Sequence, residues 1–170
     1  MTNPDSFPGV DVQSETLTEN CPPWGGQAAG NLAYQKQATQ KTTAFDGDPG
    51  RAVDGNWDGY YYDGSVTHTD YEYFPWWKVD LQSSQFISFM EIFNRTDCCS
   101  DRLYSLVIGL SDDDVNWTNS FWVSPDTSQP RKPTRVNIDA SARYVTVMLW
   151  GPGYLSLAEV HVFGAGTDRL

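Results

Sequence analysis

Two arginines, an aspartate between them and two adjacent cysteines lie within eight residues of this chain and could together bind a polar ligand. Arg95 and Arg102 flank Asp97, which directly precedes Cys98 and Cys99. A guanidinium is a planar fork that donates to two neighbouring oxygens, and a nearby carboxylate can fix its orientation. This geometry suits vicinal hydroxyls. The alternative is a surface cluster of ion pairs without function, in which each pair contributes about 0–1 kcal/mol.

The adjacent cysteines leave several pairings open. Neighbouring Cα atoms are about 3.8 Å apart, closer than the roughly 4.4–6.8 Å usual for a disulfide. A bond between Cys98 and Cys99 would therefore be strained, and Cys21 is the only other candidate partner, so one thiol stays unpaired whatever the pairing. If the adjacent pair does bond, its two sulfurs form a flat, polarisable platform on which the face of a sugar ring could rest.

The two histidines of the chain, His68 and His161, lie in different settings. His161 alternates with Val160 and Val162, which is typical of a strand, and we expect it to be hydrogen-bonded or solvent-facing rather than a ligand. His68 lies in a polar loop at residues 64–70. By the general tendency of polar residues, it would be a surface residue.

Length and charge exclude several classes of protein. With 170 residues, the chain is expected to form one compact domain. Its formal charge of -11 repels nucleic acid and anionic lipid surfaces. No apolar run approaches about 18 residues, and the N-terminus lacks the basic and apolar blocks of a signal peptide. We therefore expect neither nucleic-acid binding nor membrane insertion, and secretion would need another route or a segment outside this sequence.

Short apolar runs rich in β-forming residues must position these loops. Strands are predicted, between turn-forming residues, at residues 86–93, 106–110, 143–150 and 159–163. No segment competes as a long amphipathic helix, so the predicted fold class is all-β, an antiparallel β-sandwich of the jelly-roll kind with its functional residues on loops. Residues 1–26 carry four of the ten prolines without periodicity and are a predicted tail or strap, and residues 165–170 are a predicted C-terminal tail.

A spacing pattern links the loop histidine to the two arginines. His68, twenty-six intervening residues, Arg95, one residue, Asp97, four residues and Arg102 follow a pattern in which the chain resembles the F-type lectins, or fucolectins, a fucose-binding family. Further matching blocks lie at residues 31–33, 38–40, 52–56, 65–69, 76–81 and 154–160. The resemblance covers residues 27–164. It implies a galactose-binding-like jelly roll that binds sugar without chemical turnover, so we expect no enzyme activity.

The resemblance also assigns roles to the four residues of the pattern. It implies that His68, Arg95 and Arg102 donate hydrogen bonds to the axial 4-hydroxyl, the 3-hydroxyl and the ring oxygen of L-fucose. Asp97 matches the position that orients an arginine. A sugar that leaves a buried donor unpaired loses about 1–3 kcal/mol, so fixed donors select for hydroxyl geometry.

Contacts to the faces and methyl group of the sugar are implied in the same way. Cys98 and Cys99 match a vicinal disulfide that packs against the sugar ring. The C6 methyl of fucose needs an apolar rim, and Tyr61, Tyr62 and Phe45 lie in loops that flank the site in the family. Each of these aromatic residues could instead be an ordinary turn or core residue.

A structural calcium ion is a further implication of the resemblance. Its ligands would be the backbone carbonyls of Arg51, Asn56 and Ala158, the side chains of Asp54 and Glu159, and Ser65. Oxygen ligands from a loop and a strand end suit this cation. Residues 54–59 also match the first half of an EF-hand loop, but Ser65 stands where the bidentate glutamate should be. A simple turn at residues 54–56 is the alternative.

Several functional alternatives stay open. Val66 and Ala158 stand where several animal members carry a cross-linking cystine, so the chain is closer to the cystine-poor members. A discoidin-like module would bind phospholipid or collagen, and a glycosidase would need two carboxylates about 5–10 Å apart. A carbohydrate-binding module of a larger enzyme or toxin is a third alternative. We expect an extracellular or cell-surface lectin that gains avidity as a homo-oligomer, with its glycan preference set by loops 42–49 and 58–64.

Overall fold

The computed structural model describes residues 28–166. The predicted tail at residues 1–26, including Cys21, and residues 167–170 lie outside this range. In chain order the strands are β1 (Gln37–Gln40), β2 (Glu72–Tyr73), β3 (Trp76–Asn94), β4 (Leu106–Ser111), β5 (Asn119–Val123), β6 (Thr134–Leu149), β7 (Pro152–Gly153) and β8 (Leu157–Phe163). Three short 3-10 helices are η1 (Pro49–Val53), η2 (Tyr61–Asp63) and η3 (Ser100–Arg102).

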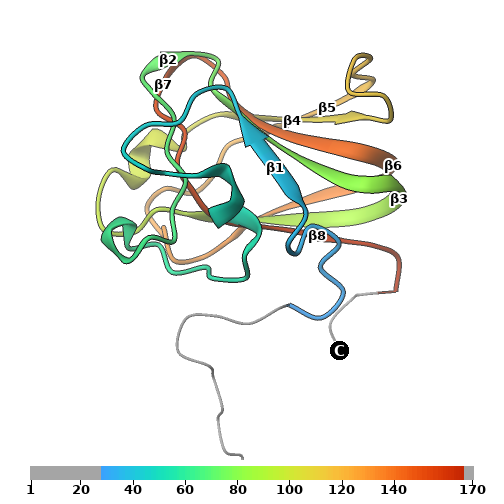
Figure 1. Ribbon diagram of the computed structural model, residues 1–170, viewed down its shortest axis with the longest axis horizontal. Helices are drawn as coiled ribbons and strands as arrows, with labels where there is room; N and C mark the ends of the chain where they lie inside the picture. The colour runs from blue at the N-terminus through green and yellow to red at the C-terminus, as the bar shows by residue number, and fades with distance from the viewer. Residues whose placement is uncertain (1–27, 167–170) are drawn as a thin grey trace, which may run out of the picture.

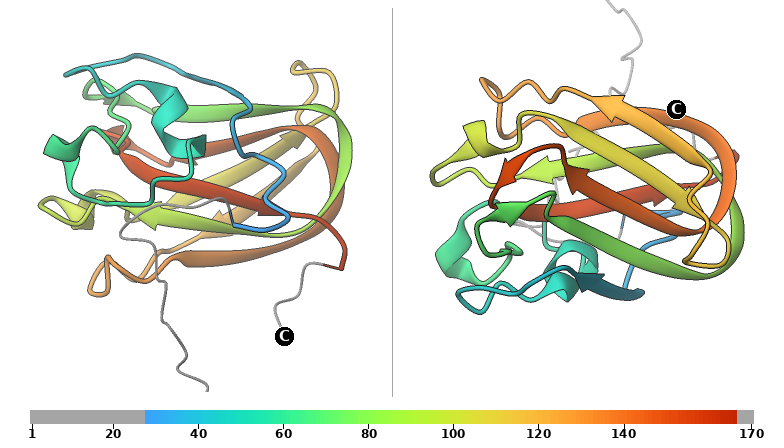
Figure 2. Two further views of the ribbon diagram at one scale, coloured as in Figure 1. Left: turned by 60° about the horizontal axis from the view of Figure 1, so that its bottom comes forward. Right: turned by 90° about the horizontal axis from the view of Figure 1, so that it is seen from above.

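The strands form an antiparallel β-sandwich, which confirms the predicted fold class. Six strands pair in one sheet in the order β1-β3-β6-β4-β5, with β8 added beside β3, while β2 pairs with β7. The first half of β3 pairs with β1 and its second half with β8. Figures 1 and 2 show that β3 and β6 are long and strongly curved, so each of them contributes to both layers.

Alternation of apolar and polar residues along β3 fills the core from both of its halves. Trp77 and Val79 point inward from the first half, and Ile87 and Ile92 from the second, all nearly fully buried. The strand predicted at residues 86–93 is therefore only the second half of β3. Between the halves lies an exposed polar stretch at residues 82–84, where the register with β6 shifts and the sheet bends.

The loops that carry the three 3-10 helices gather at one end of the sandwich, opposite the end where β3 and β6 bend (Figure 1). Helix η1 begins with Pro49, and the side chain of Asp48 accepts a hydrogen bond from the Gly50 amide at its start. Within residues 28–166, no helix is long and apolar enough to cross a membrane. The sandwich presents the loops that carry the 3-10 helices at one end.

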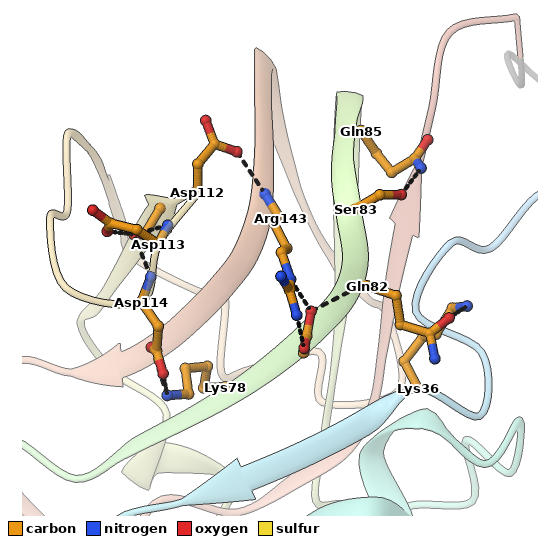
Figure 3. Close-up of polar contacts among 11 residues, drawn as sticks. Lys36, Lys78, Gln82, Ser83, Gln85, Asp112, Asp113, Asp114 and Arg143 are labelled. Carbon is orange, nitrogen blue, oxygen red and sulfur yellow. Dashed lines mark hydrogen bonds and ion pairs between the residues drawn. The ribbon is translucent and has the colours of Figure 1, made fainter.

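Pairs of oppositely charged side chains lie on the outer face of β3 and β6 near the bend (Figure 3). Arg143 donates two hydrogen bonds to the carboxylate of Asp80, at 2.8 and 2.9 Å. Lys78 contacts both carboxylate oxygens of Asp114 at 2.6 Å. Asp112 accepts a hydrogen bond from the Arg143 amide at 3.1 Å. Lys78 and Arg143 are therefore each paired with a carboxylate.

Candidate functional site

A pocket of about 580 Å³ lies among the loops at the end of the sandwich that carries η1, η2 and η3. Eight of the nine residues predicted for the sugar site line it, namely Phe45, Tyr61, Tyr62, His68, Arg95, Cys98, Cys99 and Arg102. The ninth, Asp97, lies behind Arg95. Asp46 and Tyr154, which the sequence prediction did not include, complete the lining.

Arg95 is fixed in one orientation by Asp97. The end of β3 delivers Arg95 to the pocket, and its Nε and Nη2 donate to the two carboxylate oxygens of Asp97, both at 2.8 Å. The amide of Tyr61 donates to the same carboxylate at 3.2 Å. The bond to Arg95 lowers the pKa of Asp97 and raises the pKa of Arg95. Arg95 is thus a permanent cation whose remaining donors are available to a ligand.

His68 is buried rather than exposed as a loop residue of its type would usually be, with 4% of its surface accessible. Its Nδ1 lies 2.7 Å from the carbonyl oxygen of Thr69. Because a carbonyl only accepts, Nδ1 carries the proton, and Nε2 of the neutral ring is an acceptor. Burial and the nearby arginines Arg95 and Arg102 lower the pKa of His68, which keeps the ring neutral at physiological pH.

Two tyrosines connect this imidazole to the two guanidiniums. The Cζ atom of Arg95 lies 4.5 Å from the ring centre of Tyr61, which lies 5.7 Å from the ring centre of His68. On the other side Tyr154 lies 5.3 Å from His68, and the Cζ atom of Arg102 lies 4.6 Å from the centre of Tyr154. These stacked cations and rings hold one another in place. Tyr154 begins a block that was matched to the family, but nothing in its residue type marked it as a pocket residue.

The two adjacent cysteines are bonded to each other, with their Cα atoms 3.8 Å apart. This result decides between the pairings left open by the sequence. Asn94 donates to the carbonyl of Ser100 at 2.9 Å, and the Arg102 amide donates to that of Cys99 at 3.1 Å, so the loop around the disulfide is anchored. Both sulfur-bearing residues line the pocket.

Apolar groups form the rim. Phe45 and Tyr62 are 72% and 77% exposed, and the Tyr61 hydroxyl donates to the carbonyl of Phe45, which ties the two loops together. The pocket therefore combines fixed cationic donors, one imidazole acceptor, a disulfide and exposed aromatic edges. This combination suits a neutral, hydroxyl-rich ligand that carries an apolar group.

The residues predicted to bind calcium lie beside η1. Glu159 is fully buried and accepts from the Gly55 amide at 3.3 Å through Oε2, while its Oε1 has no hydrogen-bond partner among the described residues. Burial and the charge of Asp54 raise the pKa of Glu159 to about 9. Asp54 accepts from the Asn56 amide at 2.8 Å, so the alternative turn exists as well. A buried carboxylate oxygen without a partner among the described residues, with the charge of Asp54 nearby, fits a hard cation.

Other members of the predicted calcium set have partners within the protein. Arg51 donates its side chain to the Val66 carbonyl at 3.1 Å, which leaves its own carbonyl as the predicted ligand. The Ser65 hydroxyl donates to the carbonyl of Asp58. Within residues 28–166, no group of three or more His, Cys, Asp or Glu side chains is arranged to hold a metal ion. A cation here would therefore need carbonyl oxygens in addition to the carboxylates of Asp54 and Glu159.

His161 differs from its prediction as a hydrogen-bonded or solvent-facing residue. It is 1% exposed, and neither ring nitrogen has a hydrogen-bond partner among the described residues. Its Nδ1 lies 3.7 Å from a carboxylate oxygen of Glu91, and its Nε2 lies 3.9 Å from one of Glu159. The prediction was wrong because every residue of β8 is buried, so alternation along this strand does not reach solvent.

Comparison with known proteins identifies the family. Residues 51–147 match the F5/F8 type C family described as a NedA-like, galactose-binding domain. Fucolectin-6 of Anguilla japonica is 37% identical over 140 residues, which cover 78% of this chain and 74% of that protein. The chain belongs to the fucolectin family. This assignment agrees with the resemblance that the His68 to Arg102 spacing indicated.

Solved structures with the same fold support the family assignment. The lectin domain of lectinolysin, in complex with Lewis B antigen, is 35% identical with a TM-score of 0.76, over 81% of this chain and 99% of that one. A fucose binding module of Streptococcus pneumoniae is 38% identical with a TM-score of 0.73, over 79% and 94% of the two chains. These similar structures are a lectin domain and a fucose binding module, in agreement with the expectation that the chain is not an enzyme.

Proposed function

We propose that this fucolectin is a lectin that binds L-fucose and fucosylated glycans in the pocket formed by Arg95, Arg102, His68 and the Cys98–Cys99 disulfide. The observation that carries the proposal is the convergence of these groups, distant in sequence, on one pocket of about 580 Å³. Relatives named fucolectins and a solved fucose binding module support this ligand class.

The hydrogen-bonding pattern fits a hydroxyl that both donates and accepts. Nε2 of neutral His68 accepts a hydrogen bond from a sugar hydroxyl, and the guanidiniums of Arg95 and Arg102 donate to the sugar oxygens. The histidine role is therefore acceptance, which differs from the donation implied by the sequence resemblance. An axial hydroxyl placed between the imidazole and a guanidinium would satisfy both, whereas a sugar without it would leave a desolvated group unpaired at a cost of about 1–3 kcal/mol.

The disulfide and the aromatic rim would contact the apolar parts of the sugar. The bonded pair Cys98–Cys99 would pack against the ring face, and Tyr61, Tyr62 and Phe45 would surround the C6 methyl. Burying a methyl group against such surfaces contributes about 0.8 kcal/mol. The pocket should therefore favour a 6-deoxy sugar over the same sugar with a C6 hydroxyl.

Titration calorimetry with L-fucose tests this proposal. The unmodified chain should bind saturably, and Arg95→Ala and His68→Ala should each weaken binding at least tenfold. Arg143→Ala is the matched control, because Arg143 makes the same two-bond contact with a carboxylate, Asp80, away from the pocket. Full binding by both pocket variants would reject the site, and no binding by the unmodified chain would reject the function.

The preferred fucosylated glycan depends on the loops around the pocket. A related domain, the lectin domain of lectinolysin, has been solved in complex with Lewis B antigen. In this chain loops 42–49 and 58–64 contribute Phe45, Asp46, Tyr61 and Tyr62 to the lining. A glycan array compared between the unmodified chain and Tyr62→Ala would show whether the exposed rim selects the sugar next to fucose.

Calcium is proposed as a structural ion. Asp54 and Glu159 would supply charged oxygens, with Ser65 and the carbonyls of Arg51, Asn56 and Ala158 completing the set. The ion would neutralise the exposed carboxylate of Asp54 and the buried carboxylate of Glu159, and it would fasten η1 to β8. The unpaired Glu159 Oε1 and the raised pKa of Glu159 support this fit. Calcium at 100 times its dissociation constant should stabilise the fold by about 2.7 kcal/mol. An unchanged melting temperature in EDTA would contradict it.

An extracellular or cell-surface location and assembly into a homo-oligomer complete the proposal. One shallow monosaccharide site binds weakly, so avidity would come from several sites presented together. The alternative that this chain is a carbohydrate-binding module of a larger protein is supported by its similarity to the lectin domain of lectinolysin. Sedimentation equilibrium that finds only monomer would remove the homo-oligomer.

A further inference from the structure

A second concave surface lies on the outer face of the β3-β6-β4-β5 sheet. This groove of about 410 Å³ is lined by Trp76, Trp117, Met148, Gly109, Thr146 and Ser120, among others. None of these residues lines the fucose pocket. Fucose binding at the loop end makes no use of this groove.

Strand register places the lining residues side by side. One row across four strands consists of Trp76, Met148, Val107 and Trp122. The next row consists of Lys78, Thr146, Gly109 and Ser120. Because side chains of these rows point to the same face of the sheet, large aromatic residues flank a floor of smaller ones.

Gly109 keeps the floor hollow. A Cβ atom at this position would lie 2.7 Å from the Thr146 hydroxyl and 3.3 Å from Cε3 of Trp117. Trp117 comes from the loop between β4 and β5 and is 39% exposed, so its ring stands beside the groove with one part in solvent. The absence of a side chain at Gly109 lets the indole approach the backbone.

Aromatic residues are concentrated on this face well beyond the groove itself. Trp122 is 62% exposed and lies 4.8 Å from Trp150, ring centre to ring centre, and Trp150 lies 4.9 Å from Phe74. With Trp76 and Trp117, four of the seven tryptophans of the chain are on this face. Exposed aromatic side chains grouped in this way favour a binding surface.

The polar groups of the groove are hydroxyls, and the charges beside it are paired. Ser120 is exposed, and the Thr146 hydroxyl makes only a long contact of 3.5 Å to the Gly109 carbonyl. Lys78 is paired with Asp114 and Arg143 with Asp80 (Figure 3). The groove therefore complements a neutral ligand, while the net charge of -11 repels an anionic one.

We propose that this groove is a second carbohydrate site, which takes a neutral saccharide chain. The C–H face of a pyranose ring would stack on the indole of Trp117 or Trp76, and its hydroxyls would bond to Ser120 and Thr146. An apolar protein surface or a lipid tail would cover these hydroxyls without replacing their water, which carries a desolvation penalty. A saccharide supplies both an apolar face and hydroxyls. The proposal does not rest on fucose binding.

Titration of the intact chain with neutral hexasaccharides tests the proposal, with tryptophan fluorescence and calorimetry as measurements. Cellohexaose, mannohexaose and chitohexaose are each added in the presence of saturating L-fucose. At least one should bind saturably, and Trp117→Ala should weaken that binding at least tenfold. Trp150→Ala is the matched control, since Trp150 is an exposed tryptophan of the same face that does not line the groove. Its binding should stay within twofold.

Further variants separate the outcomes. Arg95→Ala, which disables the first pocket, should leave hexasaccharide binding unchanged. Ser120→Tyr fills the groove from an exposed position and should abolish hexasaccharide binding. It tests the groove independently, in case Trp117→Ala fails to fold. The proposal fails if none of the three hexasaccharides binds, or if Arg95→Ala abolishes their binding. It also fails if Trp117→Ala instead abolishes self-association of the chain, because the face would then join two copies.

Discussion

The ion pair between Arg95 and Asp97 offers a sharp test of how the pocket is built. Replacing Asp97 with asparagine keeps the size and shape of the side chain but removes its charge. One side-chain oxygen remains to accept from Arg95 Nε and the Tyr61 amide, whereas the amide group would face Nη2, a donor. The side chains of Arg95 and Asp97 are only 9% and 7% exposed, so solvent compensates little.

The expected size of the effect follows from these contacts. A hydrogen bond between charged groups contributes about 1.5–3 kcal/mol, and breaking a buried pair costs about 3–5 kcal/mol. Asp97→Asn loses the bond from Arg95 Nη2, and the remaining bond from Nε no longer has a charged acceptor. We therefore expect the free energy of unfolding to fall by about 2–4 kcal/mol. For a chain of this size, the melting temperature should fall by roughly 5–15 °C. Arg95 would lose its fixed orientation, and L-fucose affinity should fall at least tenfold.

Urea denaturation and titration calorimetry measure the two effects separately. Asp101→Asn is the matched control, because Asp101 is an exposed carboxylate near Asp97 and outside the pocket lining. That control should change unfolding by less than about 0.5 kcal/mol and leave fucose affinity within twofold. If Asp97→Asn unfolds like the unmodified chain and binds fucose normally, the argument that Asp97 positions Arg95 is refuted.

Three further outcomes are expected. The unmodified chain should be more stable than Asp97→Asn, and this difference should be complete above pH 3.9, about the pKa of aspartate in the unfolded chain. The difference should shrink as the pH falls through the lowered pKa of Asp97 in the folded chain. Urea denaturation at pH 7, 4 and 2.5 measures it. Gly47→Ala should lose fucose binding and stability, because its Cβ would lie 2.3 Å from the His68 amide nitrogen, whereas Gly50→Ala, whose nearest contact is 3.1 Å, should bind normally in calorimetry. Glu159→Gln should abolish the rise in melting temperature that calcium is expected to cause, as scanning calorimetry would show. Without calcium, in EDTA at pH 7, the free energy of unfolding should change by less than about 1 kcal/mol, because the Glu159 carboxyl, with a pKa of about 9, is already neutral.

Much of the fold could be predicted from short apolar runs, but the length of the strands could not. The runs predicted at residues 86–93 and 143–150 cover only the later parts of β3 and β6, and the second run extends one residue beyond the end of β6. Both strands continue through polar stretches. Residues 82–84 look like a loop because they are polar, yet they remain in the strand at its bend, exposed to solvent. A polar stretch indicates that its residues are exposed to solvent, but it does not show whether they belong to a loop or to the exposed middle of a curved strand.

The pocket was predictable where a residue type and a fixed spacing coincide. Arg95, Asp97 and Arg102 satisfy both conditions, and the structure brings the two arginines to the pocket with Asp97 behind one of them. Tyr154 was missed because a tyrosine at the start of a strand block has many roles, and only its position between His68 and Arg102 gives it this one. The burial of His161 was missed because β8 is covered on both faces, which depends on elements distant in sequence.

Because β3 and β6 run through both layers, each layer shares its hydrogen-bond ladder with the other. Loss of pairing in one layer withdraws two strands from its neighbour, so the sandwich has no half that could melt alone. We expect scanning calorimetry to record one heat-absorption peak, with equal calorimetric and van't Hoff enthalpies. Damage to either sheet would then reach the loops that hold His68 and Arg95, although no atom of the pocket had been touched.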